Sequence, residues 1–269
     1  MPAATPALEV PTREGDDLLW TNRTATWLRE LRRCEFRGDT GTRRSADTES
    51  VLVILSGTLD LYAGGSTWTR RGARSTPFEG RPIALYLPPL CPYGSTGGEG
   101  VVLIASVRTP PFEPARDARA AATQKPLLPL LGSGKAFDPT TGDWRPRETF
   151  PDSPEAILPR RITRVDTATG ASFERILGLD YKTRGLAVDE AALVPGVPLR
   201  CEPPRAAGYP SEAAVWLELD GEVLCDGVPV VGDGRPRVLV CSPERMPELV
   251  LRRGRAYALA VWAGAKPAT

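Results

Sequence analysis

The chain has 269 residues, enough for two domains, and its 34 Lys and Arg residues nearly balance its 33 Asp and Glu residues, leaving a net charge of +1. So small a charge gives no electrostatic reason to expect nucleic acid or an anionic membrane as a partner. The chain contains no histidine, which excludes Ser-His-Asp triads, Cys-His dyads and metal sites built on imidazole.

The first half shows a succession of strand patterns. Residues 1–16 are rich in Pro, Ala and charge and are expected to form an irregular arm. Strands are expected at 24–31, 50–55, 58–62, 66–69, 83–87 and 101–107, with turns at Ser56-Gly57 and over 94–100. Residues 108–150 break the pattern and are expected to connect two domains, with one short helix at 115–123.

The second half repeats this order of strands and Gly turns. Strands are expected at 173–179, 186–194, 213–219, 222–225, 228–231, 237–241, 248–251 and 256–262. SVLVILSGTLDLYAGG at 50–65 is matched by AAVWLELDGEVLCDG at 213–227. The repeat predicts an all-β chain with two copies of one barrel. The expected domains are 1–112, a connection at 113–155, and 156–269.

The cysteines and the N-terminal residues bear on the cellular compartment in which the protein is expected. Cys34, Cys91, Cys201, Cys225 and Cys241 are scattered without a C-x-x-C pair, which favours free thiols in a reducing compartment. The first ten residues lack the pattern of a signal peptide, and no apolar run approaches the roughly 20 residues of a membrane span. We therefore expect a cytoplasmic protein without a membrane partner.

Residues 49–89 resemble the first barrel of the 5-deoxy-glucuronate isomerases of inositol catabolism, which are related to the 4-deoxy-5-keto-uronate isomerases. The resemblance rests on Thr67–Pro82 (TWTRRGARSTPFEGRP), which is similar to the family phrase G-x-R-x-S-x-F-E-x-x-P, and on the closing Trp262-Ala263-Gly264. It implies a bicupin, two jelly-roll β-barrels in one chain. It also implies a sugar-acid isomerase whose metal is held mainly by histidines of the second barrel.

The metal-ligand positions of that family are largely lost in this sequence. Pro203-Pro204 matches the family's Pro-Pro-His-x-His phrase, but the ligand positions fall on Arg205 and Ala207. The remaining two fall on Glu218 and Met246, so at most one of four can ligate. A first-row metal needs three or four converging N, O or S donors. We therefore predict a barrel without metal or other cofactor.

The candidate site lies at the mouth of the second barrel. Arg205 and Glu218 are the predicted catalytic pair: the guanidinium would anchor a carboxylate, enolate or carbonyl oxygen, and the carboxylate would orient the substrate or act as acid or base. The alternative is a salt bridge that fills the old metal volume. The residues expected to contact substrate are Arg200, Glu202, Tyr209, Trp216, Met246, Tyr257 and Trp262, although the tryptophans and Met246 could equally be core residues.

The first barrel offers fewer candidates. Arg74, Glu79 and Tyr86 belong to or follow the family-like phrase, which we expect to build an interface between barrels or subunits rather than a second site. No phosphate loop or dinucleotide motif is present.

The function expected from these observations is a metal-independent isomerisation or cyclisation of a small organic substrate in natural-product biosynthesis. A non-catalytic binding or structural cupin is one alternative, and a sugar-acid isomerase like 5-deoxy-glucuronate isomerase is another. A small molecule is the expected partner, and homodimer formation is left open.

Overall fold

The computed structural model of the chain describes residues 7–14, 17–21, 27–45, 48–108, 162–178, 183, 185–204, 206 and 209–264, with three short strands between 128 and 146. This described part is all-β apart from one 3-10 turn, η2 (Pro243–Arg245). It includes no helix that is long and apolar enough to cross a membrane. The helix expected at 115–123 lies outside the described residues.

The first barrel is one antiparallel sheet in the order β2-β3-β4-β9-β6-β7, with β5 paired to β9 and β8 paired to β6. Two long strands, β6 and β9, form its centre and pair along most of their length. The strand bounds are β2 (Thr12–Glu14), β3 (Asp17–Thr21), β4 (Leu28–Asp39), β5 (Arg43–Arg44), β6 (Thr48–Ala63), β7 (Ser66–Arg71), β8 (Ile83–Leu87) and β9 (Pro92–Arg108).

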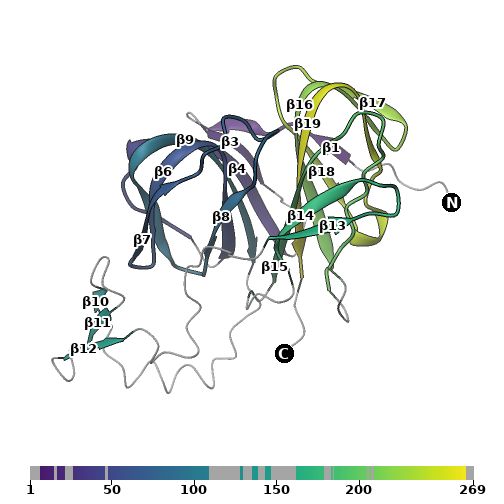
Figure 1. The fold of residues 1–269 in the computed structure, drawn as a ribbon. Helices are drawn as coiled ribbons and strands as arrows, with labels where there is room; N and C mark the ends of the chain where they lie inside the picture. The colour runs from purple at the N-terminus through teal and green to yellow at the C-terminus, as the bar shows by residue number, and fades with distance from the viewer. Residues whose placement is uncertain are drawn as a thin grey trace.

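The second barrel has the order β1-β18-β16-β19-β15-β14-β13, with β17 paired to β16, and it stands beside the first (Figure 1). Its strand bounds are β13 (Thr163–Asp166), β14 (Ser172–Leu177), β15 (Leu186–Ala192), β16 (Glu212–Cys225), β17 (Val228–Val231), β18 (Arg237–Cys241) and β19 (Leu249–Ala263). A small separate sheet joins β10 (Leu128–Pro129), β11 (Lys135–Asp138) and β12 (Asp143–Pro146), within the connection predicted from the sequence.

The N-terminal arm is not wholly irregular. Its strand β1 (Ala7–Glu9) pairs antiparallel with Val238–Val240 of β18 and so adds a strand to the second barrel. The expectation of an irregular arm is therefore wrong for these residues. Backbone hydrogen bonds to the edge of β18 supply the order that the composition of the arm does not indicate.

Several glycines that were expected to form turns lie instead within continuous, bent strands. Gly57 of β6 pairs with Gly100 of β9, and Gly221 of β16 pairs with Gly254 of β19 at the corresponding place in the second barrel. Gly57 has φ +88°, and a Cβ there would lie 2.1 Å from the Glu99 carbonyl oxygen. These glycine pairs let each pair of long strands bend around its barrel. The loop expected over 94–100 is likewise part of β9.

Three apolar clusters follow from the alternation of side chains along the strands. One fills the first barrel, one fills the second, and the third lies between the barrels. On β16, Val215 and Leu217 point into the second barrel, while Ala214 and Trp216 point toward the first. Both faces of the central strands are thus buried, and the two barrels share a continuous core.

Candidate functional site

A cavity of about 650 Å³ opens at one end of the second barrel. Its wall comes from the segment that follows β15 and from η2. An isolated bridge between Leu199 and Leu249 pairs that segment with the start of β19. Arg200, Glu202, Tyr209 and Met246, all predicted to contact substrate, line this cavity together with Cys201 and Glu244. The structure thus brings together four of the predicted site residues.

A buried ion pair supports the wall of this cavity. Asp189 of β15 is completely buried, and Arg175 of β14 donates to its two carboxylate oxygens from Nε and Nη2 at 2.8 and 3.1 Å. The indole Nε1 of Trp262 donates to Asp189 Oδ2 at 2.8 Å. Arg175 Nη2 also donates to the Glu202 carbonyl oxygen at 2.7 Å, which fixes the backbone of the cavity wall. Burial raises the pKa of Asp189, while Arg175 and Trp262 act in the opposite direction.

The Tyr209 hydroxyl and the two thiols at this end of the barrel are engaged in contacts within the protein or are kept protonated by burial. The Tyr209 hydroxyl donates to the Trp262 carbonyl oxygen at 3.2 Å. The thiol of Cys241 contacts the thioether of Met246 at 3.3 Å. Burial raises the pKa of Cys241 to about 12 and that of the Cys201 thiol further still. Both thiols are therefore protonated at neutral pH and are poor nucleophiles.

Glu218 lies elsewhere, and its predicted place in the second-barrel cavity is wrong. Its Oε1 accepts from Arg33 Nε of β4 at 3.1 Å and from Trp216 Nε1 at 3.3 Å. Glu218 is therefore part of the contact between the barrels, beside a crevice of about 150 Å³. Its predicted partner Arg205 lies outside the described residues.

Trp216 and Tyr257 also face the first barrel rather than the cavity. Interior positions on β16 and β19 belong to alternate residues, including Leu217, Ala258 and Trp262. Consecutive side chains of a strand point to opposite faces of the sheet, so a residue next to one that points into the barrel must point out of it. The expectation that Trp216 and Tyr257 line the mouth of the second barrel is therefore wrong. Trp262 does point inward, where it supports Asp189.

A second buried ion pair joins the barrels. Arg74, from the family-like phrase, donates to both oxygens of Glu190 on β15 at 2.9 and 3.2 Å, and its Nε donates to the Ile54 carbonyl oxygen. The Tyr257 hydroxyl donates to Glu190 Oε2 at 2.9 Å. The interface predicted for this phrase is thus present at Arg74, whereas Glu79 is exposed.

Tyr86 contributes to the same interface. Its hydroxyl donates to Glu49 Oε1 at 2.8 Å, and Glu49 Oε2 accepts from the backbone nitrogen of Gly185 at 2.8 Å. Arg74 and Glu49, the latter held by Tyr86, thus connect the first barrel to the second.

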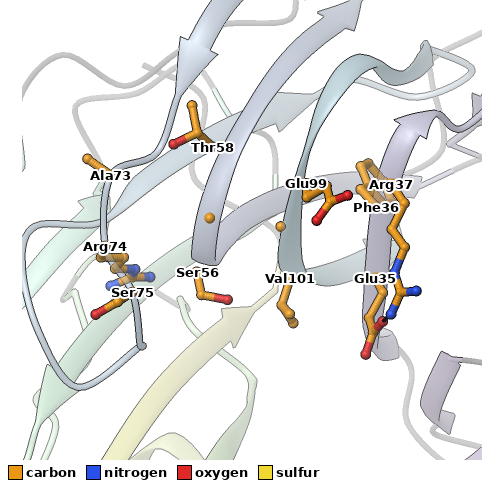
Figure 2. A pocket seen from close by; sticks show the side chains of 12 residues that line it. Glu35, Phe36, Arg37, Ser56, Thr58, Ala73, Arg74, Ser75, Glu99 and Val101 are labelled. Carbon is orange, nitrogen blue, oxygen red and sulfur yellow. Dashed lines mark hydrogen bonds and ion pairs between the residues drawn. The ribbon is translucent and has the colours of Figure 1, made fainter.

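An open groove of about 530 Å³ lies on the first barrel beside the buried guanidinium of Arg74. Figure 2 shows Glu35 and Arg37 of β4 on one side and the loop at Ala73–Ser75 on the other. Arg37 Nη2 donates to Glu35 Oε2 at 2.6 Å, and Arg74 is held by Glu190. Because both arginines that line it are already paired with carboxylates, this groove is a weaker candidate than the second-barrel cavity.

The donors that the structure describes do not fit the metal implied by the resemblance. Glu218 is ion-paired with Arg33 between the barrels, and the Met246 thioether contacts Cys241. Among the described residues, no group of three or more Cys, Asp or Glu side chains is placed to hold a metal ion. A first-row metal requires such a convergence.

The two packed barrels give the chain a bicupin fold. Residues 24–134 match the model of the KduI/IolB family, and no curated protein sequence matches the chain. This match lies in the first barrel and the connection, and it confirms the resemblance to the 5-deoxy-glucuronate isomerases that the sequence indicated.

Solved structures agree on the fold over nearly the whole chain. An IolB-like protein from Salmonella typhimurium LT2 has a TM-score of 0.62 at 15% identity, covering 96% of this chain and 92% of that one. Quercetin 2,3-dioxygenase from Acinetobacter baumannii has a TM-score of 0.56 at 14% identity, covering 96% and 86%. The Escherichia coli pirin YhhW in complex with nickel(II) has a TM-score of 0.53 at 11% identity, covering 96% and 100%. The prediction of an all-β bicupin is confirmed.

Sequence reasoning missed Arg175, Asp189 and Glu190. The available signal was the adjacent acidic pair in the middle of an apolar strand, LAVDEAALV at 186–194. Two neighbouring acids in a strand buried on both faces must each find a cation, one on each side of the sheet. Nothing in the sequence named the arginines that supply those charges.

Proposed function

We propose that the protein is a metal-independent isomerase that binds a small organic acid in the cavity of the second barrel. The observation behind this proposal is the placing of one guanidinium, Arg200, and two carboxylates, Glu202 and Glu244, around a cavity of about 650 Å³. In this proposal Arg200 binds the substrate carboxylate. Glu202 or Glu244 then moves a proton between neighbouring substrate carbons as general base and acid.

The ion pair behind the cavity has a positioning role in this proposal. Arg175 holds the Glu202 backbone at 2.7 Å while it binds Asp189, so the Glu202 carboxylate projects from a fixed point. Preorganisation of this kind lets a static arrangement of charges accelerate a unimolecular reaction. Arg205 remains a proposed second anchor for the substrate.

The match of the first barrel to the KduI/IolB family supports a sugar acid as the substrate class. Ring closure of another small substrate in a biosynthetic pathway is the finer alternative, because it makes the same demands on orientation. Binding without catalysis is a second candidate function. It is favoured by the state of Asp189, the buried carboxylate behind the cavity. Arg175 and Trp262 donate hydrogen bonds to both of its oxygens, so Asp189 does not offer a free base to a bound molecule.

The test is solvent exchange during turnover. Uronates and keto-uronates are incubated with the protein in deuterium oxide and followed by proton NMR, because an acid–base isomerisation introduces deuterium at the carbon that is reprotonated. If Glu202 is the base, Glu202→Gln should lower the rate by about 10²–10⁴-fold with the fold intact, and the same loss should follow Glu244→Gln if Glu244 is the base. The exposed Asp166→Asn is the matched control.

Metal independence is tested on the same preparation. The proposal expects turnover to survive exhaustive chelation and elemental analysis to find no stoichiometric metal. About one metal ion per chain, with activity lost on chelation and restored by that ion, would refute this part of the proposal. Tight binding of an acid with no exchange and no product would establish the binding function instead.

A further inference from the structure

Another pocket, of about 260 Å³, opens at the end of the first barrel, and neither the proposed reaction nor the resemblance uses it. We call it the hydroxyl pocket, and the residues that matter to it are Arg29, Glu30, Arg44, Ser50, Tyr93 and Ser106. We propose that the hydroxyl pocket is a binding site for a small hydroxy carboxylate. This site is separate from the proposed active site and independent of it.

The strand register builds the hydroxyl pocket. Glu30 of β4, Ser106 of β9 and Ser50 of β6 are direct cross-strand neighbours, so their side chains share one face of the sheet. Deeper on the same face, Leu52 and Ile104 belong to the apolar core of the barrel. Hydroxyl groups thus replace apolar side chains only where the barrel opens.

A bulge adds a cation to this face. The register of β4 shifts between Leu28 and Glu30, so Arg29 has no partner in the ladder. Neighbouring strand residues normally point to opposite faces, whereas a bulge lets both Arg29 and Glu30 line the pocket.

The hydroxyl groups are buried and retain unused hydrogen-bonding capacity. Ser50 Oγ lies 2.9 Å from Ser106 Oγ and 3.4 Å from Thr48 Oγ1. These two contacts use two of the three hydroxyl protons, which leaves one donor for another acceptor. Tyr93 is 8% exposed, and its hydroxyl has no hydrogen-bond partner among the described residues. A ligand oxygen in the pocket would accept from both.

The charges of the pocket select the class of ligand. Neither Arg29 nor Arg44 forms an ion pair with a carboxylate of the described residues, and both line the pocket. Within the described part of the chain, the one ion-pair contact of Glu30 is a distant one at 3.8 Å with Arg32, which is already bound to Asp17 at 3.1 Å. Two guanidiniums without an ion-pair partner among the described residues favour a carboxylate as the ligand.

Glu30 further restricts which ligands fit the hydroxyl pocket. An ionised carboxylate only accepts hydrogen bonds, so Glu30 calls for a ligand hydroxyl as donor, and its charge disfavours a dianion. The pocket volume corresponds to roughly nine water molecules, which suits a hydroxy acid of a few carbons. Inorganic phosphate and uncharged polyols each satisfy only part of this set.

Calorimetric titration of the full chain tests the proposal with glycerate, malate, glycerol and inorganic phosphate. Glycerate should bind more tightly than malate, phosphate or glycerol, because malate is a dianion at neutral pH and Glu30 disfavours a second negative charge. Tyr93→Phe should weaken glycerate binding about tenfold, because it removes one hydrogen bond to a charged ligand and keeps the ring. Tyr62→Phe is the matched control, since the Tyr62 hydroxyl bonds to Gly41 and Thr42 on the outside of the same barrel.

A chemical measurement on the unaltered protein locates the site. Phenylglyoxal modifies accessible arginines, and peptide mapping should show that glycerate protects Arg29 and Arg44 but not the exposed Arg37. Protection of Arg200 instead would place the ligand in the second barrel and overturn the hydroxyl pocket, whatever the outcome for the isomerase. Phosphate binding as tight as that of glycerate, or an unchanged affinity in Tyr93→Phe, would also overturn it.

Discussion

Replacing Arg74 by alanine should destabilise the protein by about 3–5 kcal/mol, because it strands the carboxylate of Glu190 between the two barrels. The side chains of Arg74 and Glu190 are only 3% and 6% exposed, so water cannot replace the lost cation. The substitution also removes the donor to the Ile54 carbonyl oxygen at 2.7 Å. The Tyr257 hydroxyl would remain the sole described partner of Glu190.

The free energy of unfolding is measured by urea titration, followed by both tryptophan fluorescence and circular dichroism. Two probes are needed because a chain with two barrels could lose one barrel before the other, and then a single free energy would have no meaning. Arg164→Ala is the control, since Arg164 and Asp166 form an ion pair with side chains 68% and 74% exposed. It should change the free energy by less than about 1 kcal/mol.

The double variant Arg74→Met, Glu190→Leu distinguishes the cost of an uncompensated buried charge from the cost of lost packing. It removes both members of the pair and should recover most of the loss, because apolar side chains often replace a buried ion pair without a penalty. A loss below about 1 kcal/mol in Arg74→Ala would refute the reasoning. So would a double variant less stable than Arg74→Ala, since the uncompensated charge would then not be the cause.

Two further predictions concern the cores of the barrels. Burial raises the pKa of Cys34 to about 12, so above pH 9 the unfolded chain releases a proton that the folded protein keeps, and the free energy of unfolding should fall by about 1.4 kcal/mol per pH unit for this thiol. Urea titrations at rising pH should show a slope shallower by that amount in Cys34→Ala, and an unchanged slope would contradict the burial argument. Gly57→Ala should be more destabilising than Gly227→Ala, because both have positive φ but only the Cβ at position 57 would meet backbone, at 2.1 Å. Equal losses by thermal unfolding would show that the close approach of the strands is unimportant.

The sequence by itself determined the class of the fold. Gly and Pro between short β-branched runs indicated an all-β chain, and the likeness of 50–65 to 213–227 indicated two copies of one barrel. Both signals are local, because turn chemistry and β propensity act over a few residues. The family-like phrase at 67–82 also indicated an interface, and Arg74 lies in it.

Arg200, Glu202, Tyr209 and Met246 could likewise be assigned to one barrel end from the sequence, and the structure places them around one cavity. They lie in or beside connections between strands, which meet at the ends of a barrel whatever the exact register. A prediction of this kind needs the order of the strands, but it does not need to know to which face of the sheet each strand side chain points.

Only the tertiary structure decided which side of each central strand faces a cavity. AAVWLEL on β16 shows no alternation, because the second core covers one face and the first barrel covers the other. For that reason the sequence could not show that Glu218 turns to Arg33, or that Asp189 and Glu190 turn apart to Arg175 and Arg74. Each of these pairs joins residues from separate segments of the chain, and the two that cross between the barrels exist only once the barrels have packed together.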